Sequence, residues 1–351
     1  MKKIFQWGIM TGAIAGLVGC ASVGTQDGVV SAKKRTGGFM GLATEADVKT
    51  QYDAAFKDVQ QVVIGGFKVG FNESKELIDH RGGGLTGPSR TAVGQVKLEG
   101  VSDAVRQQIT DAVYERFVAL LQDNGYEVVP RSTFTSIPEY AKVKETEFPF
   151  VDDKSGLFSS YGVGTVYAPT AMGRHQPFFE GEQEPGMFTG FDLMGIVNAS
   201  SNFARYSPAR LMNVSFTIDF AAAADTRGFV KHALELGQAL AVDSARLGIT
   251  GGSTGVYAHR TGSITLGQPV ASESEFATIE DATDEVSAGA RLATSMVFGF
   301  LKGGLAGAAG SSQDQTREYI FHADEGKYAA ATNEVLDKAM ARMIETMVSL
   351  R

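Results

Sequence analysis

The chain has very little cysteine: Cys20 is the only one among 351 residues. A lone thiol cannot form a disulfide within the chain, nor supply the several thiolates of a structural zinc site. The chain also lacks a convincing N-terminal membrane span. Its first apolar stretch, Ile4 to Val18, is shorter than the roughly 20 residues that a helix needs to cross a bilayer. These absences exclude a disulfide framework, a thiolate metal centre and an N-terminal membrane-spanning helix.

Catalytic motifs are also missing. The five histidines are scattered without an HExxH pattern or a close pair: His80, His175, His232, His259 and His322. The segment Gly251-Gly252-Ser253-Thr254-Gly255 has the G-x-S-x-G spacing of a nucleophile turn, yet no strand-to-helix elbow surrounds it, so a glycine-rich hairpin turn is the better interpretation. The carboxylate pairs Asp152-Asp153 and Glu280-Asp281 lie in polar runs typical of solvated surface. We therefore expect no enzyme activity, cofactor or metal; a hydrolase using Ser253 is the least favoured hypothesis.

The composition is that of a globular protein, with 43% hydrophobic and 21% charged residues. The formal net charge is −8, and the part after Cys20 is more acidic still, because Lys2 and Lys3 precede it. An acidic surface repels phosphates, which argues against a nucleic-acid partner. The 42 glycines indicate turns, hairpins and close backbone packing.

The N-terminus has the layout of a secretory signal: two lysines, an apolar stretch and small residues. The signal ends in Leu17-Val18-Gly19-Cys20, which resembles the bacterial lipobox. The resemblance implies cleavage after residue 19 and attachment of palmitate-type acyl chains to Cys20, the only site residue that we assign. The residue after the cysteine is Ala21. In that family an aspartate at this position directs retention in the inner membrane. We therefore expect an anchor in the outer membrane, on its periplasmic face.

Residues 20–45 are predicted to form a lipidated tether, because they are rich in small residues and lack apolar periodicity. The basic cluster Lys33-Lys34-Arg35 within them is interpreted as a solvated linker. Residues 46–351 are predicted to form a single large domain.

Periodicity within this domain predicts several regular elements. Period-two alternation predicts strands at 62–71, 91–98, 126–129, 212–221 and 318–322, with a hairpin over 247–266. The strands at 62–71 and 91–98 are expected to be neighbours in one sheet, and Gly65-Gly66 to permit a bulge or a close contact. Apolar stripes predict helices from Ser102 to Asp123, with Ser102 as N-cap and Gly125 as the left-handed stop, and from Lys327 to Leu350.

Two segments depart from these patterns. Residues 148–207 are predicted to be a long irregular insertion or loop system rich in glycine and phenylalanine. Its rings Phe178, Phe179, Phe188 and Phe191 are expected to pack on the domain or on a partner. Residues 288–309 combine the apolar run Met296 to Leu301 with Gly303 and Gly307. This segment is interpreted as a buried or partner-facing helix and loop, with membrane contact as the alternative.

The elements together predict an α+β fold (an α/β sandwich): a mixed sheet with amphipathic helices packed on it and a long insertion. Their order, with the lipobox, resembles envelope lipoproteins of the curli-secretion-channel (CsgG) type, whose periplasmic domain is similar to the N-terminal domain of TolB. The resemblance implies an assembling envelope protein. This chain differs from those lipoproteins because its sequence has no two adjacent strands with a continuous lipid-facing apolar alternation.

We expect a lipoprotein of structural, assembly or secretion-associated function, bound to membrane lipid through Cys20 and to envelope proteins or itself. The alternative is a periplasm-facing lipoprotein that binds a small ligand or glycan, with a pocket lined by Tyr161, Tyr167 or Phe178.

Overall fold

The computed structural model has an α+β fold, which confirms the predicted class. The structure describes residues 22–32, 34–37, 43–81, 90–153, 162–182, 189–224, 233–251, 261–283 and 315–351. The predictions that fall outside the described residues include the signal peptide, Cys20, Ser253 and the 288–309 segment.

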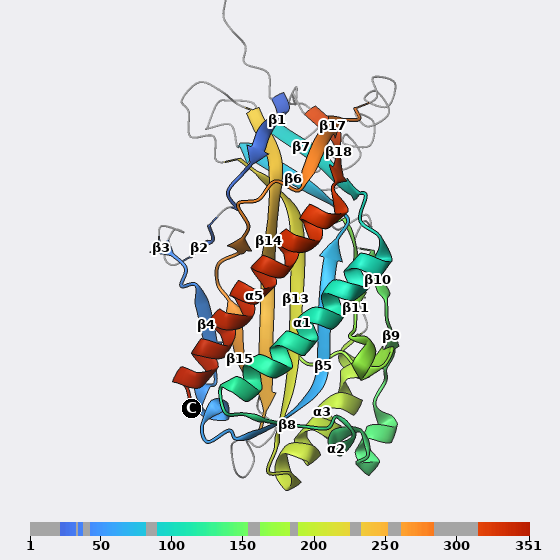
Figure 1. The fold of residues 1–351 in the computed structure, drawn as a ribbon, viewed down its shortest axis with the longest axis vertical. Coiled ribbons are helices and arrows are strands. Elements are labelled where there is room, and N and C mark those ends of the chain that lie inside the picture. Colours follow the sequence, from blue (N-terminus) through green and yellow to red (C-terminus); the bar gives the residue numbers. More distant parts are fainter. Residues whose placement is uncertain are drawn as a thin grey trace, which may run out of the picture.

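The larger sheet has 10 described strands and runs the length of the molecule (Figure 1). Its path is β10 (Phe150–Asp153), β11 (Val163–Tyr167), β5 (Gln61–Asn72), β13 (Arg210–Ala223), β14 (Ala233–Thr250), β15 (Thr261–Leu266) and β4 (Val48–Gln51). Off this path, β1 (Ser22–Val29) and β16 (Val270–Ala271) pair with β14, and β8 (Glu127–Val129) pairs with β5.

A smaller sheet of 4 described strands covers one end of the larger one. Its order is β17 (Ala277–Asp281), β18 (Gln315–Ala323), β7 (Arg90–Glu99) and β6 (Ser74–Arg81). Two short ladders complete the described pairing: β2 (Thr36–Gly37) with β3 (Ala43–Thr44), and β9 (Thr146–Glu147) with β12 (His175–Gln176).

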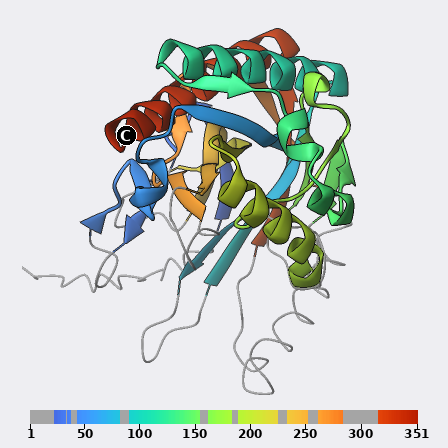
Figure 2. The same ribbon diagram turned by 90° about the horizontal axis from the view of Figure 1, so that it is seen from below.

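Helices cover both faces of the larger sheet. The long helices α1 (Asp103–Asp123) and α5 (Glu325–Ser349) lie side by side on one face, and α3 (Thr189–Tyr206) lies on the other (Figure 2). Shorter turns flank α3 and the strand ends: α2 (Ser132–Thr135), η2 (Asp53–Phe56), η3 (Pro138–Lys142) and η4 (Thr170–Met172). The main core fills the space under α1 and α5, and a second cluster packs α3 against Val63 and Leu211 of the sheet.

The two long helices begin and end as the sequence predicts. The Ser102 hydroxyl accepts a hydrogen bond from the Val105 amide, and Gly125 adopts the left-handed φ of +80° that ends α1. The Asp324 carboxylate caps α5 at the Lys327 amide. The apolar stripe of α5 is fully buried: Val335, Leu336, Ala339, Met340, Met343, Ile344 and Met347. The methionines therefore serve core packing.

The glycine pair in β5 marks a bulge, as predicted. The register of β5 against β13 shifts between Ile64 and Gly66. Because of this shift, Val62 and Ile64 before the bulge and Phe67 after it all lie in the main core. A Cβ atom at Gly66 would lie 2.6 Å from the Phe179 ring, which makes this also a close contact.

Three predictions about the arrangement are wrong. The strands around 62–71 and 91–98 are not neighbours, because β5 lies in the larger sheet and β7 in the smaller one. The insertion at 148–207 contains regular structure, above all α3. Residues 22–29 of the expected tether form β1, which pairs in parallel with β14. The other predicted strands and the pairing of β14 with β15 are confirmed.

Candidate functional site

The strand β1 fixes the N-terminal segment to the body of the molecule. Ser22 pairs with Ala233 and Thr25 with Leu236, at the start of β14. Val23 and Val30 are buried, and the Val30 amide donates to the Gln238 carbonyl at 2.9 Å. The segment that would carry a lipid at Cys20 is thus part of the folded domain from Ser22 onward.

A second set of contacts holds the chain just after β1. The Arg35 guanidinium donates to the backbone carbonyl of Asp243 at 2.7 Å and to its carboxylate at 3.1 Å. The Gln268 side chain accepts from the Arg35 amide and donates to the carbonyls of Arg35 and Glu45. The interpretation of the basic cluster as a solvated linker is therefore wrong for Arg35. Lys34 is exposed, and Lys33 lies outside the described residues.

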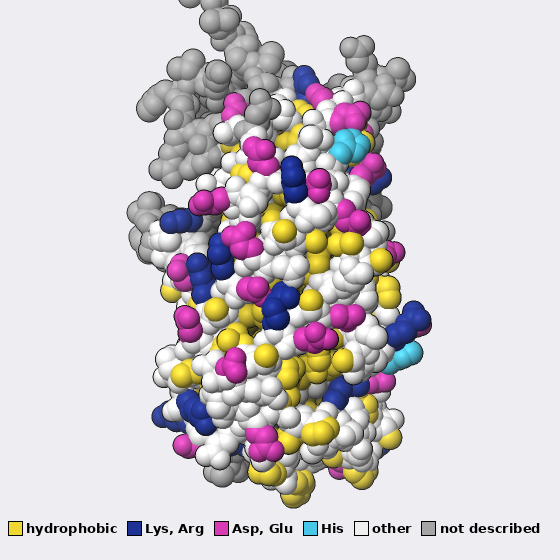
Figure 3. All heavy atoms as spheres, in the orientation of Figure 1, with side chains coloured by type: hydrophobic (Ala, Val, Ile, Leu, Met, Phe, Trp, Pro, Cys, Tyr) yellow, Lys and Arg dark blue, Asp and Glu magenta, His cyan; other side chains and the backbone are white. Residues whose placement is uncertain are grey.

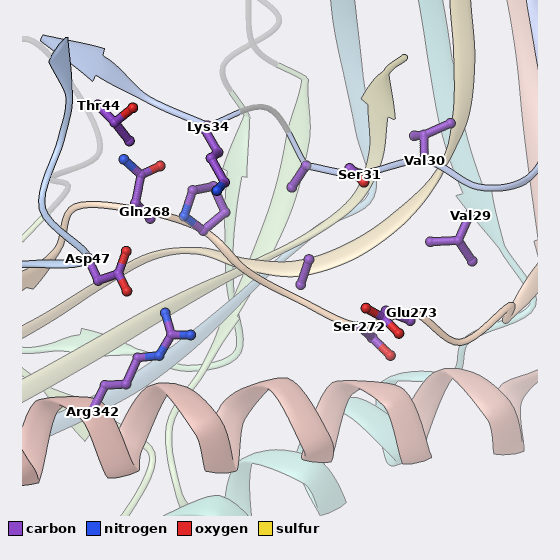
Figure 4. A pocket seen from close by; sticks show the side chains of 13 residues that line it. Val29, Val30, Ser31, Lys34, Thr44, Asp47, Gln268, Ser272, Glu273 and Arg342 are labelled. Atoms are coloured by element: carbon purple, nitrogen blue, oxygen red, sulfur yellow. The ribbon is translucent and has the colours of Figure 1, made fainter. Parts of the chain in front are cut away.

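An open cleft of about 550 Å³ lies beside this clamped segment (Figure 4). One wall is formed by residues 29–32 and Lys34, another by the connection that includes Gln268 and Ser272, and Arg342 reaches in from α5. Its volume falls within the range of small-molecule sites in proteins. No prediction from the sequence had placed a site here, because its walls come from three distant parts of the chain.

Four charged side chains line the cleft: the cations Lys34 and Arg342 and the acids Asp47 and Glu273. Among the described residues, none of the four forms a side-chain hydrogen bond or an ion pair, although opposite charges share the same cavity. Unpaired groups of both signs suit a polar ligand that carries both a positive and a negative group.

A buried ion pair lies on the opposite face of the sheet, where Lys68 of β5 meets Glu182. Their Nζ and Oε2 atoms are 2.7 Å apart, and each side chain is 2% exposed. The same carboxylate oxygen accepts a hydrogen bond from the Phe179 amide. The alternation in β5 had placed Lys68 and Gly70 together on the polar side of the strand. In the structure the 162–182 segment covers that side, so Lys68 is buried.

Aromatic rings enclose the ammonium group of Lys68. The ring centroids of Phe178, Phe179 and Phe148 lie 5.1, 5.5 and 5.9 Å from Nζ, within the range of cation–π attraction. Burial lowers the pKa of Lys68, and the adjacent Glu182 carboxylate partly opposes that shift. The phenylalanine prediction is therefore confirmed for Phe178 and Phe179, which pack on the domain. Phe188 and the Phe191 side chain lie outside what the structure describes.

A small cavity of about 20 Å³ adjoins this pair under α3. Ser200, Asn213, Thr250 and Thr261 line it, and the buried Ser200 hydroxyl has no hydrogen-bond partner in the structure. A polar space of this size holds about one water molecule. It is too small for a substrate.

The aromatic residues of the alternative pocket are dispersed, as are the histidines and carboxylates for which no site was predicted. Tyr167 is buried, with its hydroxyl donating to Asp103 at 2.7 Å, and neither it nor Phe178 lines the cleft. His322 contacts Glu280 at 2.7 Å, and Arg317 contacts Asp281 at 2.9 Å. His175 is exposed, whereas His232, His259 and Tyr161 lie outside the described residues, as does the side chain of His80.

Within the described ranges, no three histidine, cysteine or acidic side chains gather as a possible metal site. No helix in the same ranges combines the length and apolar character needed to cross a membrane.

Comparison of the chain with protein-family models, curated proteins and solved structures found no match.

Proposed function

We propose that this chain is a lipid-anchored protein of the bacterial cell envelope, attached to the outer membrane through Cys20 on its periplasmic face. Its role is to hold envelope proteins, or further copies of itself, at the membrane, without enzyme activity. The observation that carries the proposal is Leu17-Val18-Gly19-Cys20 followed within two residues by β1. An acyl anchor there acts directly on the folded domain.

The surface supports protein contacts over nucleic-acid binding. On the face that carries α1 and α5, acidic and basic side chains are interspersed and hydrophobic side chains lie between them (Figure 3). Phosphate backbones require a concentration of positive charge. The described part of this face lacks such a concentration (Figure 3), and its mixed composition is compatible with protein–protein contacts, whose composition is close to that of the rest of a protein surface.

Labelling with palmitate in a Gram-negative host tests the anchor. The full chain is expected to incorporate palmitate and to fractionate with the outer membrane, whereas Cys20→Ser loses the label and leaves the membrane fraction. Ala21→Asp is the matched control, because it keeps the label but should redirect the protein to the inner membrane. An unlabelled wild type, or label that persists in Cys20→Ser, contradicts the proposal.

Cross-linking in intact cells tests the holding role. We expect cross-links from the membrane-bound protein to envelope proteins or to a second copy. A strict monomer after detergent extraction, with no cross-linked partner in the cell, would count decisively against that role.

A second candidate is a lipoprotein that binds a small polar ligand, favoured by the cleft with its four charged side chains of both signs. Titration calorimetry on detergent-purified protein should then show binding of zwitterionic dipeptides, and Arg342→Ala should weaken it at least tenfold. Lys338→Ala, on the same helix but outside the cleft, should leave it unchanged. Absence of dipeptide binding, with uncharged oligosaccharides also inert, would eliminate this candidate.

A further inference from the structure

The position of β1 sets how far the domain can stand from an anchor. Only Ala21 lies between Cys20 and Ser22, so the two residues are two steps apart, and an extended chain spans at most about 3.6 Å per step. A lipid-bearing Cys20 can therefore lie no more than about 7 Å from the first residue of the sheet. A tether of the predicted 26 residues would have left the domain free to turn, whereas this short link fixes which end is near the lipid.

Pairing registers show which strands meet at that end. Ser22 faces Ala233, the first residue of β14. In the smaller sheet, Arg81 faces Arg90 and Gln315 faces Ala92, so that the end of β6 and the starts of β7 and β18 lie together. The two sheets touch here, because a Cβ atom at Gly94 of β7 would lie 2.4 Å from Leu236 of β14. Figure 1 shows this strand end at the top.

The opposite end of the molecule is distant. β14 has 18 residues, which at about 3.3 Å each give a span of about 60 Å. Its last residue, Thr250, faces Leu211, close to Tyr206 at the end of α3. This helix end and the C-terminus, marked in Figure 1, lie far from Ser22.

Charge pairing at the strand end suits a lipid surface. Asp281, at the end of β17, contacts Arg317 near the start of β18; Glu280 contacts His322, which pairs with Glu99 toward the other end of the smaller sheet. The exposed Ile78 on β6 adds apolar area. Although the chain as a whole is acidic, the Asp281 carboxylate at this end therefore has a cationic partner, Arg317, when it faces anionic headgroups.

We infer that the strand end, formed by the starts of β1, β7, β14 and β18 and the end of β6, lies against the lipid bilayer, while the end of α3 points away from it. The inference rests on the proposed lipid at Cys20. It adds an orientation that lipid attachment alone would not give.

Energy transfer from single tryptophans tests the orientation. The only tryptophan, Trp7, precedes Cys20, so the mature chain has none and each introduced one is the sole donor. Ile78→Trp and Thr25→Trp place exposed donors near the strand end; Tyr206→Trp places one near the far end. Each full-length lipidated protein is reconstituted in phosphatidylethanolamine–phosphatidylglycerol vesicles carrying dansyl-labelled headgroups.

We expect at least fivefold more efficient transfer from Ile78→Trp and Thr25→Trp than from Tyr206→Trp. Equal transfer, or stronger transfer from Tyr206→Trp, in protein that floats with the vesicles overturns the orientation but leaves the anchor intact. Failure to float, together with absence of palmitate label, overturns the anchor and the orientation together. Two near-end variants protect the test against misfolding of either one.

Discussion

At the scale of single residues, Lys68 shows where sequence patterning reaches its limit. Its place in the alternation of β5 indicated a polar face, and the side chain does point away from the main core. The covering layer could not be predicted, because Glu182 and the phenylalanine rings come from a segment more than 75 residues away that has no periodicity of its own. The burial of Lys68 depends on that distant segment.

Removing the Lys68 ammonium should be costly. Lys68→Met leaves the Glu182 carboxylate buried without its ion-pair partner, and we expect a loss of about 3–5 kcal/mol in the free energy of unfolding. The double variant Lys68→Met/Glu182→Gln removes the uncompensated charge and keeps an acceptor for the Phe179 amide, so it should recover more than half of that loss. Urea unfolding followed by circular dichroism measures both changes.

The matched control is an exposed pair. Lys338 and Glu334 are one turn apart on α5 and about half exposed, so Lys338→Met should change the free energy of unfolding by no more than about 0.5 kcal/mol. Similar losses for Lys68→Met and Lys338→Met would show that burial of the Lys68 pair has no energetic consequence.

At the scale of elements, local signals determined how well each was predicted. α1 and α5 have apolar stripes and capping residues, and their predicted bounds agree with the structure within about two residues. α3 was missed because glycine, serine and asparagine weaken its helical propensity. A signal was present in the spacing of Ile196, Ala199 and Phe203, all buried on the side that meets the sheet.

Gly94 gives an element-scale prediction about the contact between the sheets. A Cβ there would lie 2.4 Å from a terminal methyl group of the buried Leu236 side chain, so Gly94→Ala should force that side chain to shift and cost about 1–3 kcal/mol in the free energy of unfolding. In the Gly94→Ala/Leu236→Ala double variant, the loss should be smaller than the sum of the single losses, because the two sites share one contact. Urea midpoints of the four proteins give this comparison.

Gly70 is the control for Gly94. It also lies within a strand, but a Cβ there would meet Val166 at an ordinary 3.6 Å. Gly70→Ala should therefore be neutral or stabilise by up to about 1 kcal/mol, because alanine loses less chain entropy on folding. If Gly70→Ala and Gly94→Ala destabilise equally, the close approach of β7 to β14 is not what requires glycine.

At the scale of the whole molecule, the sequence predicted the class of fold but not its arrangement. Periodicity identifies a strand, yet it does not say which sheet the strand joins; β5 and β7 look alike in sequence and lie in different sheets. β1 has few apolar residues, and its strand conformation depends on pairing with β14. The cleft was equally beyond prediction, since its charged side chains come together only in the folded chain.

The parallel pairing of β1 with β14 has a mechanical consequence. With lipid on Cys20 and a partner held at the far end, tension would enter the domain at Ser22 along the axis of β1. Force in that direction shears the hydrogen bonds between β1 and β14 together instead of opening them one by one. The buried side chains of Val23 and Val30 and the hydrogen bonds of Arg35 would resist the same pull. The force would therefore be borne by a longer segment than β1 alone. The domain would thus bear a pull from the membrane on its central strands.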